Sequence, residues 1–344
     1  MKILNKIISF LTGEYLNFYA LQAADHTYNV IGTREDLSDL ISNISPTDCP
    51  FVNMCRTEKA DNTLVEWQMD ALAAAASNAQ LEGDVAPGAV FSPTVRAGNR
   101  TQISAKTVTT SGTVQATTKA GRGKDELAYQ ITKKTKELKR DVEFALLNNN
   151  VYNAGNTTTA RQTMGLVGWV DGGVAFGGNG SVISTGTGGN QPLYTANTAR
   201  TAATAAWAAV TEANLLTILQ NAFLVGGRPD VLLTDAKTRA TVSSWTAGST
   251  KYTDVTDKKL ISTIAVYESD YGVLQIKTDL FLPIVTQTKV LYALQSDKFA
   301  LAYLRPYKIT DLAITGDFMN KEIVVEYALK VDNNAAHGAV RDIL

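Results

Sequence analysis

Two cysteines and two histidines are the side chains of this sequence best suited to nucleophilic catalysis or metal binding. Cys49 and Cys55 lie six positions apart, whereas His26 and His337 lie near opposite ends of the 344-residue chain. A tetrahedral zinc site needs four ligands brought together, which this spacing does not favour. We therefore predict buried thiols, and neither a metal site nor a cofactor.

The glycine-rich segments do not complete a known phosphate-binding or nucleophile motif. A phosphate loop ends in Gly-Lys-Ser or Gly-Lys-Thr, or runs as Gly-x-Gly-x-x-Gly, so that backbone amides point at the ligand. The nearest segments, GRGKDE and GTGGNQ, lack these closing residues, and no Gly-x-Ser-x-Gly elbow occurs. We predict no catalytic residue, and we keep a hydrolase that uses His337 as a hypothesis from a different class.

The composition describes a folded protein without a strong electrostatic field. Hydrophobic residues make up 45% and charged residues 19% of the chain, with 32 basic against 33 acidic side chains. We therefore do not expect a protein whose main function is to bind nucleic acid through its phosphates. No run approaches the roughly 18 apolar residues of a bilayer-crossing helix, so we expect no membrane partner.

The clearest predicted element is one long helix over residues 124–150. Its apolar positions recur at helical intervals: Leu127, Ile131, Leu138, Val142, Ala145 and Leu146. The basic residues between Lys133 and Arg140 alternate with Glu137, Asp141 and Glu143. This alternation predicts a mostly solvated helix face whose charges pair with one another.

A long connection separates two predicted strands in the first half of the chain. One strand is TLVEWQMD, residues 63–70, and the second covers residues 100–109. Hairpin connections usually take about two to five residues, so the stretch 71–99 indicates a projecting functional loop. Its Ala, Gly, Asn and Pro offer too little bulky apolar surface to order the loop unaided. We expect the loop to contact another chain.

The remaining pattern predicts a mixed arrangement of helices and strands. Amphipathic helices are expected within residues 1–21 and over residues 34–45. Helices over 211–224 and 236–245 flank a buried strand, VLLT, which indicates a second domain of mixed type. Strands are then expected at residues 264–269, 273–278, 290–294, 299–304 and 321–331.

Several segments together resemble the major head proteins of tailed bacteriophages. In the first half these are REDLSDLISNISPTDCPFVNM, TLVEWQMDAL, EGDVA, residues 96–110 and GKDELAYQITKKTKELKRDVEFALL. In the second half they are GGRPDVLLTDAKTRATVSSW, VYESDYGVLQIKTDLFLP and FALAYLRPYKITDLAITGDFMNKEIVVEYALKVDNNAAHGAVRDI. The segments follow the family's order over nearly everything after residue 33.

The resemblance implies the α+β capsid fold that tailed phages share with herpesviruses. It divides the chain into an N-terminal arm with an amphipathic helix, an extended β-hairpin loop with its base strands, a peripheral domain with a long spine helix, an α/β axial domain, and the returning C-terminal strands of the peripheral domain. The corresponding residues are 1–56, 57–110, 111–162, 163–289 and 290–344, with a Gly/Thr-rich insertion at 172–210.

The function implied is that of a major capsid protein, which assembles into pentamers and hexamers of an icosahedral head around double-stranded DNA. Expected partners are other copies of the chain, neighbouring capsomers, portal, scaffold and decoration proteins, and DNA through weak non-specific contact. The expected location is the virion, after assembly in the host cytoplasm. The subunit-interface candidates are Leu4, Ile8, Leu11, Trp67, Met69, Leu81, Glu82, Asp84, Phe91, Arg96 and Arg100.

Two further hypotheses remain beside the hydrolase. A protein-shell nanocompartment shares the capsid fold and differs in its cargo, which is protein rather than DNA. A secreted adhesin or surface-layer protein is suggested by Asn-x-Ser/Thr triplets at Asn43, Asn99 and Asn156, although such triplets are common by chance and no convincing export signal precedes them.

Overall fold

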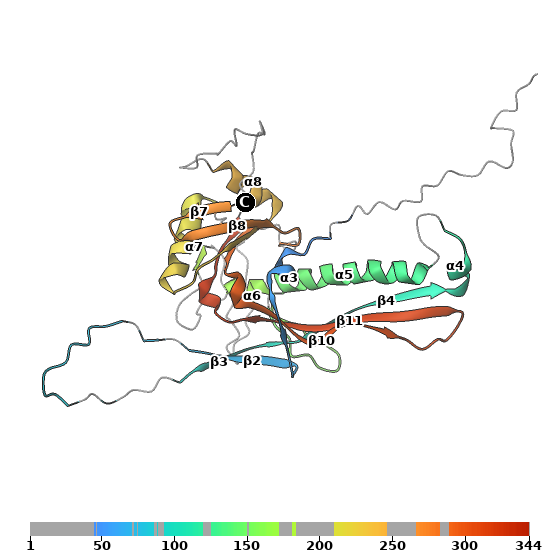
Figure 1. Ribbon diagram of the computed structural model, residues 1–344, viewed down its shortest axis with the longest axis horizontal. Coiled ribbons are helices and arrows are strands. Elements are labelled where there is room, and N and C mark those ends of the chain that lie inside the picture. The colour runs from blue at the N-terminus through green and yellow to red at the C-terminus, as the bar shows by residue number, and fades with distance from the viewer. Residues whose placement is uncertain are drawn as a thin grey trace, which may run out of the picture. The chain divides into compact units, whose positions relative to one another are not determined.

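The computed structural model describes residues 45, 47–70, 72–73, 75–85, 88, 93–119, 125–149, 151–171, 181–183, 210–245, 266–282 and 289–343. All helices and strands named below belong to one unit, formed by Ile44–Thr117 and Asp125–Leu344 (Figure 1). The two helices predicted before residue 46 and most of the insertion at 172–210 lie outside the described residues. So do four interface candidates: Leu4, Ile8, Leu11 and Phe91.

Two large sheets, beside a two-stranded one described below, organise the unit, and their mixture with helices confirms the predicted α+β class. The four-stranded sheet has the order β1, β10, β11, β4, with bounds Arg56–Lys59, Phe299–Asp311, Phe318–Val331 and Gln102–Ser111. The six-stranded sheet has the order β5, β12, β9, β6, β8, β7, with bounds Ser181–Ile183, Gly338–Ile343, Lys289–Leu294, Val231–Thr234, Gly272–Thr278 and Val266–Ser269.

The long helix α5, Glu126–Asn148, confirms the prediction for residues 124–150. Asp125 begins it, because its side chain accepts a hydrogen bond from the backbone N–H of Ala128 at 3.1 Å. The helix packs on one face of the four-stranded sheet, where alternate residues of β11 are buried as predicted. These residues are Ile323, Val325, Tyr327, Leu329 and Val331.

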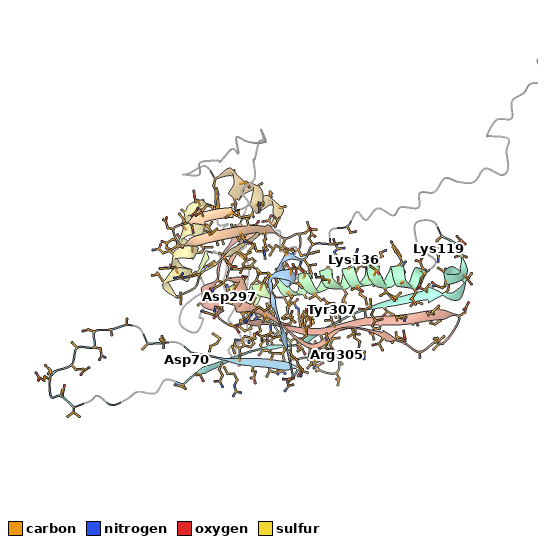
Figure 2. The ribbon with its side chains drawn as sticks, viewed as in Figure 1. Asp70, Lys119, Lys136, Asp297, Arg305 and Tyr307 are labelled. Atoms are coloured by element: carbon orange, nitrogen blue, oxygen red, sulfur yellow. The ribbon has the colours of Figure 1, made fainter. Side chains whose placement is uncertain are left out.

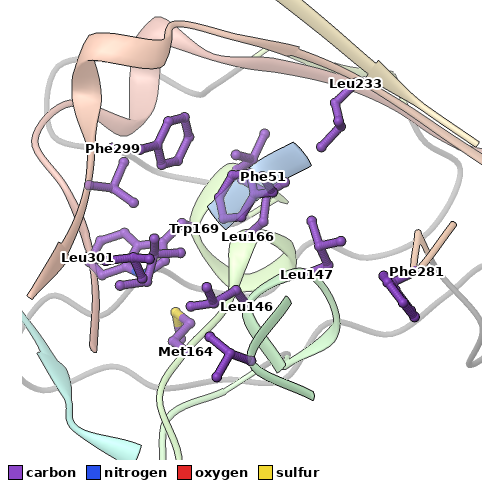
Figure 3. Close-up of a cluster of buried hydrophobic side chains, with 14 of the residues drawn as sticks. Phe51, Leu146, Leu147, Met164, Leu166, Trp169, Leu233, Phe281, Phe299 and Leu301 are labelled. Carbon is purple, nitrogen blue, oxygen red and sulfur yellow. The ribbon is translucent and has the colours of Figure 1, made fainter. Parts of the chain in front are cut away.

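One large hydrophobic cluster joins α5 to both sheets and to two short helices, α3 at Pro50–Met54 and α6 at Leu166–Asp171. Figure 3 shows Phe51 of α3 within this cluster, beside Phe299 at the start of β10. Their rings meet edge to face, with centroids 5.5 Å apart. Helix α3, which precedes β1, is thereby fixed to the core.

A second cluster lies between the six-stranded sheet and helices α7, Glu212–Leu224, and α8, Ala236–Ser244. Thr211 and Asp235 cap these helices with their side chains, as the sequence predicts for Asp235. Leu215, Ile218 and Leu219 of α7 pack on Leu232 and Leu291 of the sheet. In the described parts of the chain, no helix combines the length and the apolar character that crossing a bilayer requires.

The remaining short elements are α4, η2 and η3, with bounds Gly112–Ala116, Ser296–Lys298 and Asn334–Ala336. Strand β10 is irregular, because its register with β11 shifts between Tyr303 and Arg305 and again between Arg305 and Lys308. Strand β1 pairs with β10 only from Ala300 to Tyr303. Beyond Tyr303, the outer edge of β10 has no neighbouring strand in the described parts of the sheet.

The strand that returns from the long loop differs from the prediction. Strand β2, Leu64–Met69, pairs with β3, Val95–Arg100, which lies inside the stretch predicted as loop. The strand predicted at 100–109 is β4, and it pairs with β11 instead. The β3 sequence, VRAGNR, lacks an apolar alternation because a small residue is needed at Gly98, where a Cβ would meet the Glu66 side chain at 3.1 Å.

The five-part division of the chain stays a prediction, but one of its boundaries does not separate the two sheets. All of β9 but its first residue, and all of β12, fall in the stretch 290–344 that was assigned to the peripheral strands, yet both strands pair within the six-stranded sheet. Between them, β10 and β11 cross to the four-stranded sheet. The segment after residue 289 therefore contributes to both sheets.

Candidate subunit interface

The root of the long loop is anchored by Asn99, which is fully buried in β3. Its side-chain amide donates to the carbonyl oxygens of Met164 and Leu329, at 3.0 and 2.7 Å. Its side-chain oxygen accepts from the backbone N–H of Met164 at 2.9 Å. Because every capacity of the buried amide is used, β3 is held firmly against β11. The burial of Asn99 also excludes it as a glycosylation acceptor.

A buried ionic cluster around Glu326 of β11 supports the same root. The carboxylate is 3% exposed and binds Arg161 Nη2 at 2.7 Å and Arg305 Nε at 2.8 Å. It also accepts a hydrogen bond from Thr101 Oγ1 at 2.8 Å, one residue beyond β3. Two cations and a hydroxyl compensate the loss of hydration of the carboxylate.

Two interface candidates, Trp67 and Met69, pack on the core of their own chain. Both are half-buried, and the Trp67 ring lies 5.3 Å from the ring of Trp169 in α6. Trp67 therefore fixes the direction in which β2 leaves the body. Arg96 remains exposed and lies 3.9 Å from Glu66, whereas Arg100 is half-buried.

The three candidates Leu81, Glu82 and Asp84 are brought together at a turn far along the loop. The turn is closed by a hydrogen bond from the backbone N–H of Asp84 to the carbonyl of Leu81, and Gly83 adopts the positive φ of 83° that it needs. All three are exposed. The large apolar side chains that the structure describes in the loop are strongly exposed: Leu72 98%, Leu81 79% and Val85 86%.

Sequence reasoning missed the role of Glu143, which it assigned to a solvated helix face. The side chain is fully buried, and its two oxygens accept hydrogen bonds from the backbone N–H groups of Phe51 and Val52, each at 2.7 Å. A hydrogen bond to the buried Asp279 adds a second carboxyl group. Burial and this neighbour raise the pKa of Glu143 to about 9, so the pair shares a proton at neutral pH.

The charges of α5 pair with one another less than the sequence predicts. Glu137 does bind Lys134 within the helix, at 2.7 Å. Asp141, however, binds Lys106 of β4 at 2.6 Å, and Glu143 is buried. The prediction that the charges of this helix face pair with one another is therefore wrong for two of the three acidic residues. One of them binds the sheet and the other binds α3. No sequence signal marks these partners, since they lie 35 or more positions away.

The hydrolase hypothesis finds no support in the geometry around His337. The ring is fully buried, stacks on Phe299 at 4.4 Å, and accepts a hydrogen bond from the backbone N–H of Gln295 at Nδ1. Burial lowers the pKa of His337 to about 3 and raises that of Cys49 to about 11, which suits neither a base nor a nucleophile. Among the described residues, no group of three His, Cys, Asp or Glu is placed to hold a metal ion.

Comparison with known proteins shows the family of the chain. Residues 20–344 match the family model for the SU10 major capsid protein. The chain is 30% identical to the major capsid protein of Escherichia phage Phieco32 over 343 residues, which cover 91% of this chain and 95% of that protein.

Solved structures show the same fold at low identity. The capsid asymmetric unit of cyanophage A-1(L) is similar with a TM-score of 0.66 and 12% identity, covering 92% of this chain and 98% of that chain. The capsid of the native GTA particle, computed with C5 symmetry, is similar with a TM-score of 0.60 and 11% identity, covering 94% and 98%. On the strength of the family model and the Phieco32 relative, the chain belongs to the SU10 major capsid protein family.

Proposed function

We propose that this chain forms the pentamers and hexamers of an icosahedral head that encloses double-stranded DNA. The comparisons show that the chain is a phage major capsid protein. It is a structural protein that assembles with itself into the shell of a virion, and it is not an enzyme. The division into capsomers, the packaged DNA and assembly in the host cytoplasm belong to the proposal.

The observation that carries the proposal is the loop between β2 and β3. It combines a firmly anchored root with three almost fully exposed apolar side chains, Leu72, Leu81 and Val85. An ordered loop of this length needs a partner surface, because its own contacts do not offset the entropy lost on ordering. A neighbouring subunit supplies that surface in a shell, where obligate interfaces exceed roughly 2,000 Å² in total.

The interface candidates take different parts in this proposal. Leu81, Glu82 and Asp84 contact a neighbouring subunit directly, whereas Trp67, Met69, Arg96 and Arg100 orient the loop. Leu4, Ile8, Leu11 and Phe91 are proposed as contacts on the sequence pattern alone. Portal, scaffold and decoration proteins are proposed as further partners. The near-neutral net charge of −1 suits a lining that holds DNA only by weak, non-specific contact.

The test is to express the chain alone and in a phage-infected host and to examine the particles by negative-stain microscopy. We expect closed shells whose contents from infection are nuclease-protected DNA. Replacing the exposed Leu81 and Val85 by Asn should leave the subunit folded and strongly reduce shells, whereas Ala75→Asn in the same loop should not. Packaged protein in place of DNA would contradict the proposal and favour a nanocompartment.

A further inference from the structure

Three segments of the chain meet at two buried carboxyl groups, Glu143 and Asp279, which form the carboxyl pair. Glu143 lies on α5 and is fully buried, and Asp279 follows β8 and is 1% exposed. The two Glu143 oxygens accept hydrogen bonds from the backbone N–H groups of Phe51 and Val52 in α3, each at 2.7 Å. The carboxyl pair therefore connects α3 to α5 and to the end of a strand of the six-stranded sheet.

The hydrogen bonds around the carboxyl pair require one shared proton. Asp279 Oδ1 accepts a hydrogen bond from the backbone N–H of Phe281 at 2.8 Å. Asp279 Oδ2 is buried and meets no N–H or O–H donor from the described parts of the chain. Two carboxylates cannot hydrogen-bond to each other, because each is then only an acceptor. The contact between the two side chains is satisfied when Asp279 is the acid and donates from Oδ2 to the Glu143 carboxylate.

No cation of the described residues forms an ion pair with either member of the carboxyl pair. Lys139 and Arg140 lie on the same helix as Glu143. The Lys139 ammonium, however, binds the side-chain oxygen of Asn53 at 2.7 Å. The Arg140 guanidinium lies over a ring, 5.5 Å from its centroid. Loss of the shared proton would therefore leave two adjacent buried carboxylates that repel each other.

The other titratable groups on which the charge of Glu143 acts carry no positive charge. Two are thiols at the ends of α3, and the third is a phenol of β10 that lies below α5 in the view of Figure 2: Cys49, Cys55 and Tyr307. Ionisation of any of them would add a further negative charge. These groups therefore cannot stabilise the carboxyl pair after its proton has left.

Helix α3 has less support at this junction than the end of β8 has. Its five residues contribute one fully buried side chain, Phe51. The end of β8 has hydrogen bonds of its own. The backbone N–H of Asp279 donates to the carbonyl of Thr234 at 2.9 Å, and Asn148 Nδ2 donates to a carbonyl two residues further on, also at 2.9 Å. Repulsion within the carboxyl pair is therefore expected to loosen α3 first.

We propose that the carboxyl pair is a proton-dependent switch that holds α3 on the subunit while the pair keeps its shared proton and releases α3 when that proton leaves. Burial raises the pKa of both groups, and together with the contact to Asp279 it raises that of Glu143 to about 9. The hydrogen bonds to α3 are thus kept at neutral pH and lost as pH rises past about 9. Residues 1–56 are the predicted N-terminal arm, so the switch acts on the last helix of this arm.

Cys49 provides the test, because it is the buried residue directly before α3. Cys55→Ser leaves Cys49 as the one thiol of the chain. In this background, the rate of reaction of Cys49 with iodoacetamide is compared between dilute full-length subunits with and without Asp279→Asn. The amide introduced by this substitution can still accept from the N–H of Phe281 and donates to Glu143 at every pH. Comparison at the same pH removes the effect of thiol ionisation.

We expect equal, slow rates at pH 7. At pH 10 the chain that keeps Asp279 should react at least about tenfold faster than the chain with Asp279→Asn, because only the former loses the shared proton. Equal rates at both pH values would overturn the inference. A faster reaction of the Asp279→Asn chain at pH 7 would also overturn it, because Asp279 would then hold α3 without acting through a proton.

Two further measurements separate release of α3 from general unfolding. The far-ultraviolet circular dichroism of the chain with Asp279 should stay unchanged at pH 10, and its loss in step with the reaction of Cys49 would overturn the inference. Glu143→Gln places an amide N–H against the N–H groups of α3, so Cys49 should react fast at pH 7 and pH 10 alike. Protection of Cys49 in this variant would show that Glu143 does not hold α3.

Discussion

Two buried carboxylates of this chain are compensated in different ways. Glu326 forms ion pairs with Arg161 and Arg305. Glu143 instead caps the backbone of α3 and shares a proton with Asp279. The sequence shows that both are acidic but not which partner each meets, because the partners are backbone amides or cations far along the chain. The one sequence signal for burial of Glu326 is its position between the apolar residues Val325 and Tyr327.

Substitution of Glu326 tests the ionic cluster. Glu326→Gln leaves two guanidinium groups without a counter-charge, so we expect the free energy of unfolding of unassembled subunits to fall by about 2 to 4 kcal/mol. Glu58→Gln removes a partly exposed pair with Lys330 and should cost no more than about 1 kcal/mol. Urea unfolding followed by circular dichroism measures both. Equal effects of the two substitutions would show that the ionic cluster contributes no more to the free energy of unfolding than a partly exposed ion pair does.

His337 predicts a pH dependence with a definite sign. Its pKa is about 3 in the folded chain against an ordinary value of 6.5, so the folded state favours the neutral ring. The resulting stability is present above pH 6.5 and is lost as pH falls toward 3, by about 2 kcal/mol at pH 5. Glu143 acts in the opposite direction, because its raised pKa favours folding at low pH and this contribution is lost as pH rises toward 9.

The difference between wild type and His337→Gln isolates the histidine. The stability lost on substitution should be smaller at pH 5 than at pH 7.5 by about 2 kcal/mol, because only the wild type must keep a neutral ring against protonation. Urea unfolding at the two pH values measures it. A difference that does not change with pH would mean that the ring titrates normally in the folded chain.

At the scale of elements, the sequence predicted those whose burial follows a simple period. The apolar stripe of α5 and the apolar alternation of β11 each mark the one buried face of the element. The helix at residues 124–150 and the strand at 321–331 could therefore be predicted. Strand β3 was not, because its buried positions hold the small residues Ala97 and Gly98 and the polar Asn99 instead of an apolar alternation. Of the candidate interface, the projecting loop was predicted from its length, but the turn at Leu81–Asp84 and the inward packing of Trp67 on Trp169 were not.

The root of the loop yields a prediction at this scale. Trp67→Asp places a charge against Trp169 and should abolish shells by turning β2 away from its course. Trp67→Phe should preserve shells, because the indole Nε1 has no hydrogen-bond partner to lose. Negative-stain microscopy of the two variants at matched concentration distinguishes them. Normal shells from Trp67→Asp would show that the direction of the loop is not set at its root.

At the scale of the whole molecule, proteolysis can test the proposed contact of the loop with a neighbouring copy. A protease specific for glutamate should cut dilute subunits after Glu82, because this residue and its neighbours on the loop are exposed. In shells the same bond should be cut at least about tenfold more slowly, since the proposed contact covers the loop with another copy. Equal cutting rates in subunits and shells would mean that the loop stays uncovered after assembly.

Among the described residues, no strand pairs with the edge of β10 beyond Tyr303, and this has a consequence for newly made subunits. An open strand edge invites another chain to add a strand, and repeated addition leads to fibres. Here the register slips twice between Tyr303 and Lys308, and Pro306 provides no amide hydrogen. A passing strand therefore meets an interrupted ladder of donors and acceptors. Newly synthesised chains at high local concentration are therefore less prone to edge-to-edge aggregation. They stay available for ordered growth of the particle.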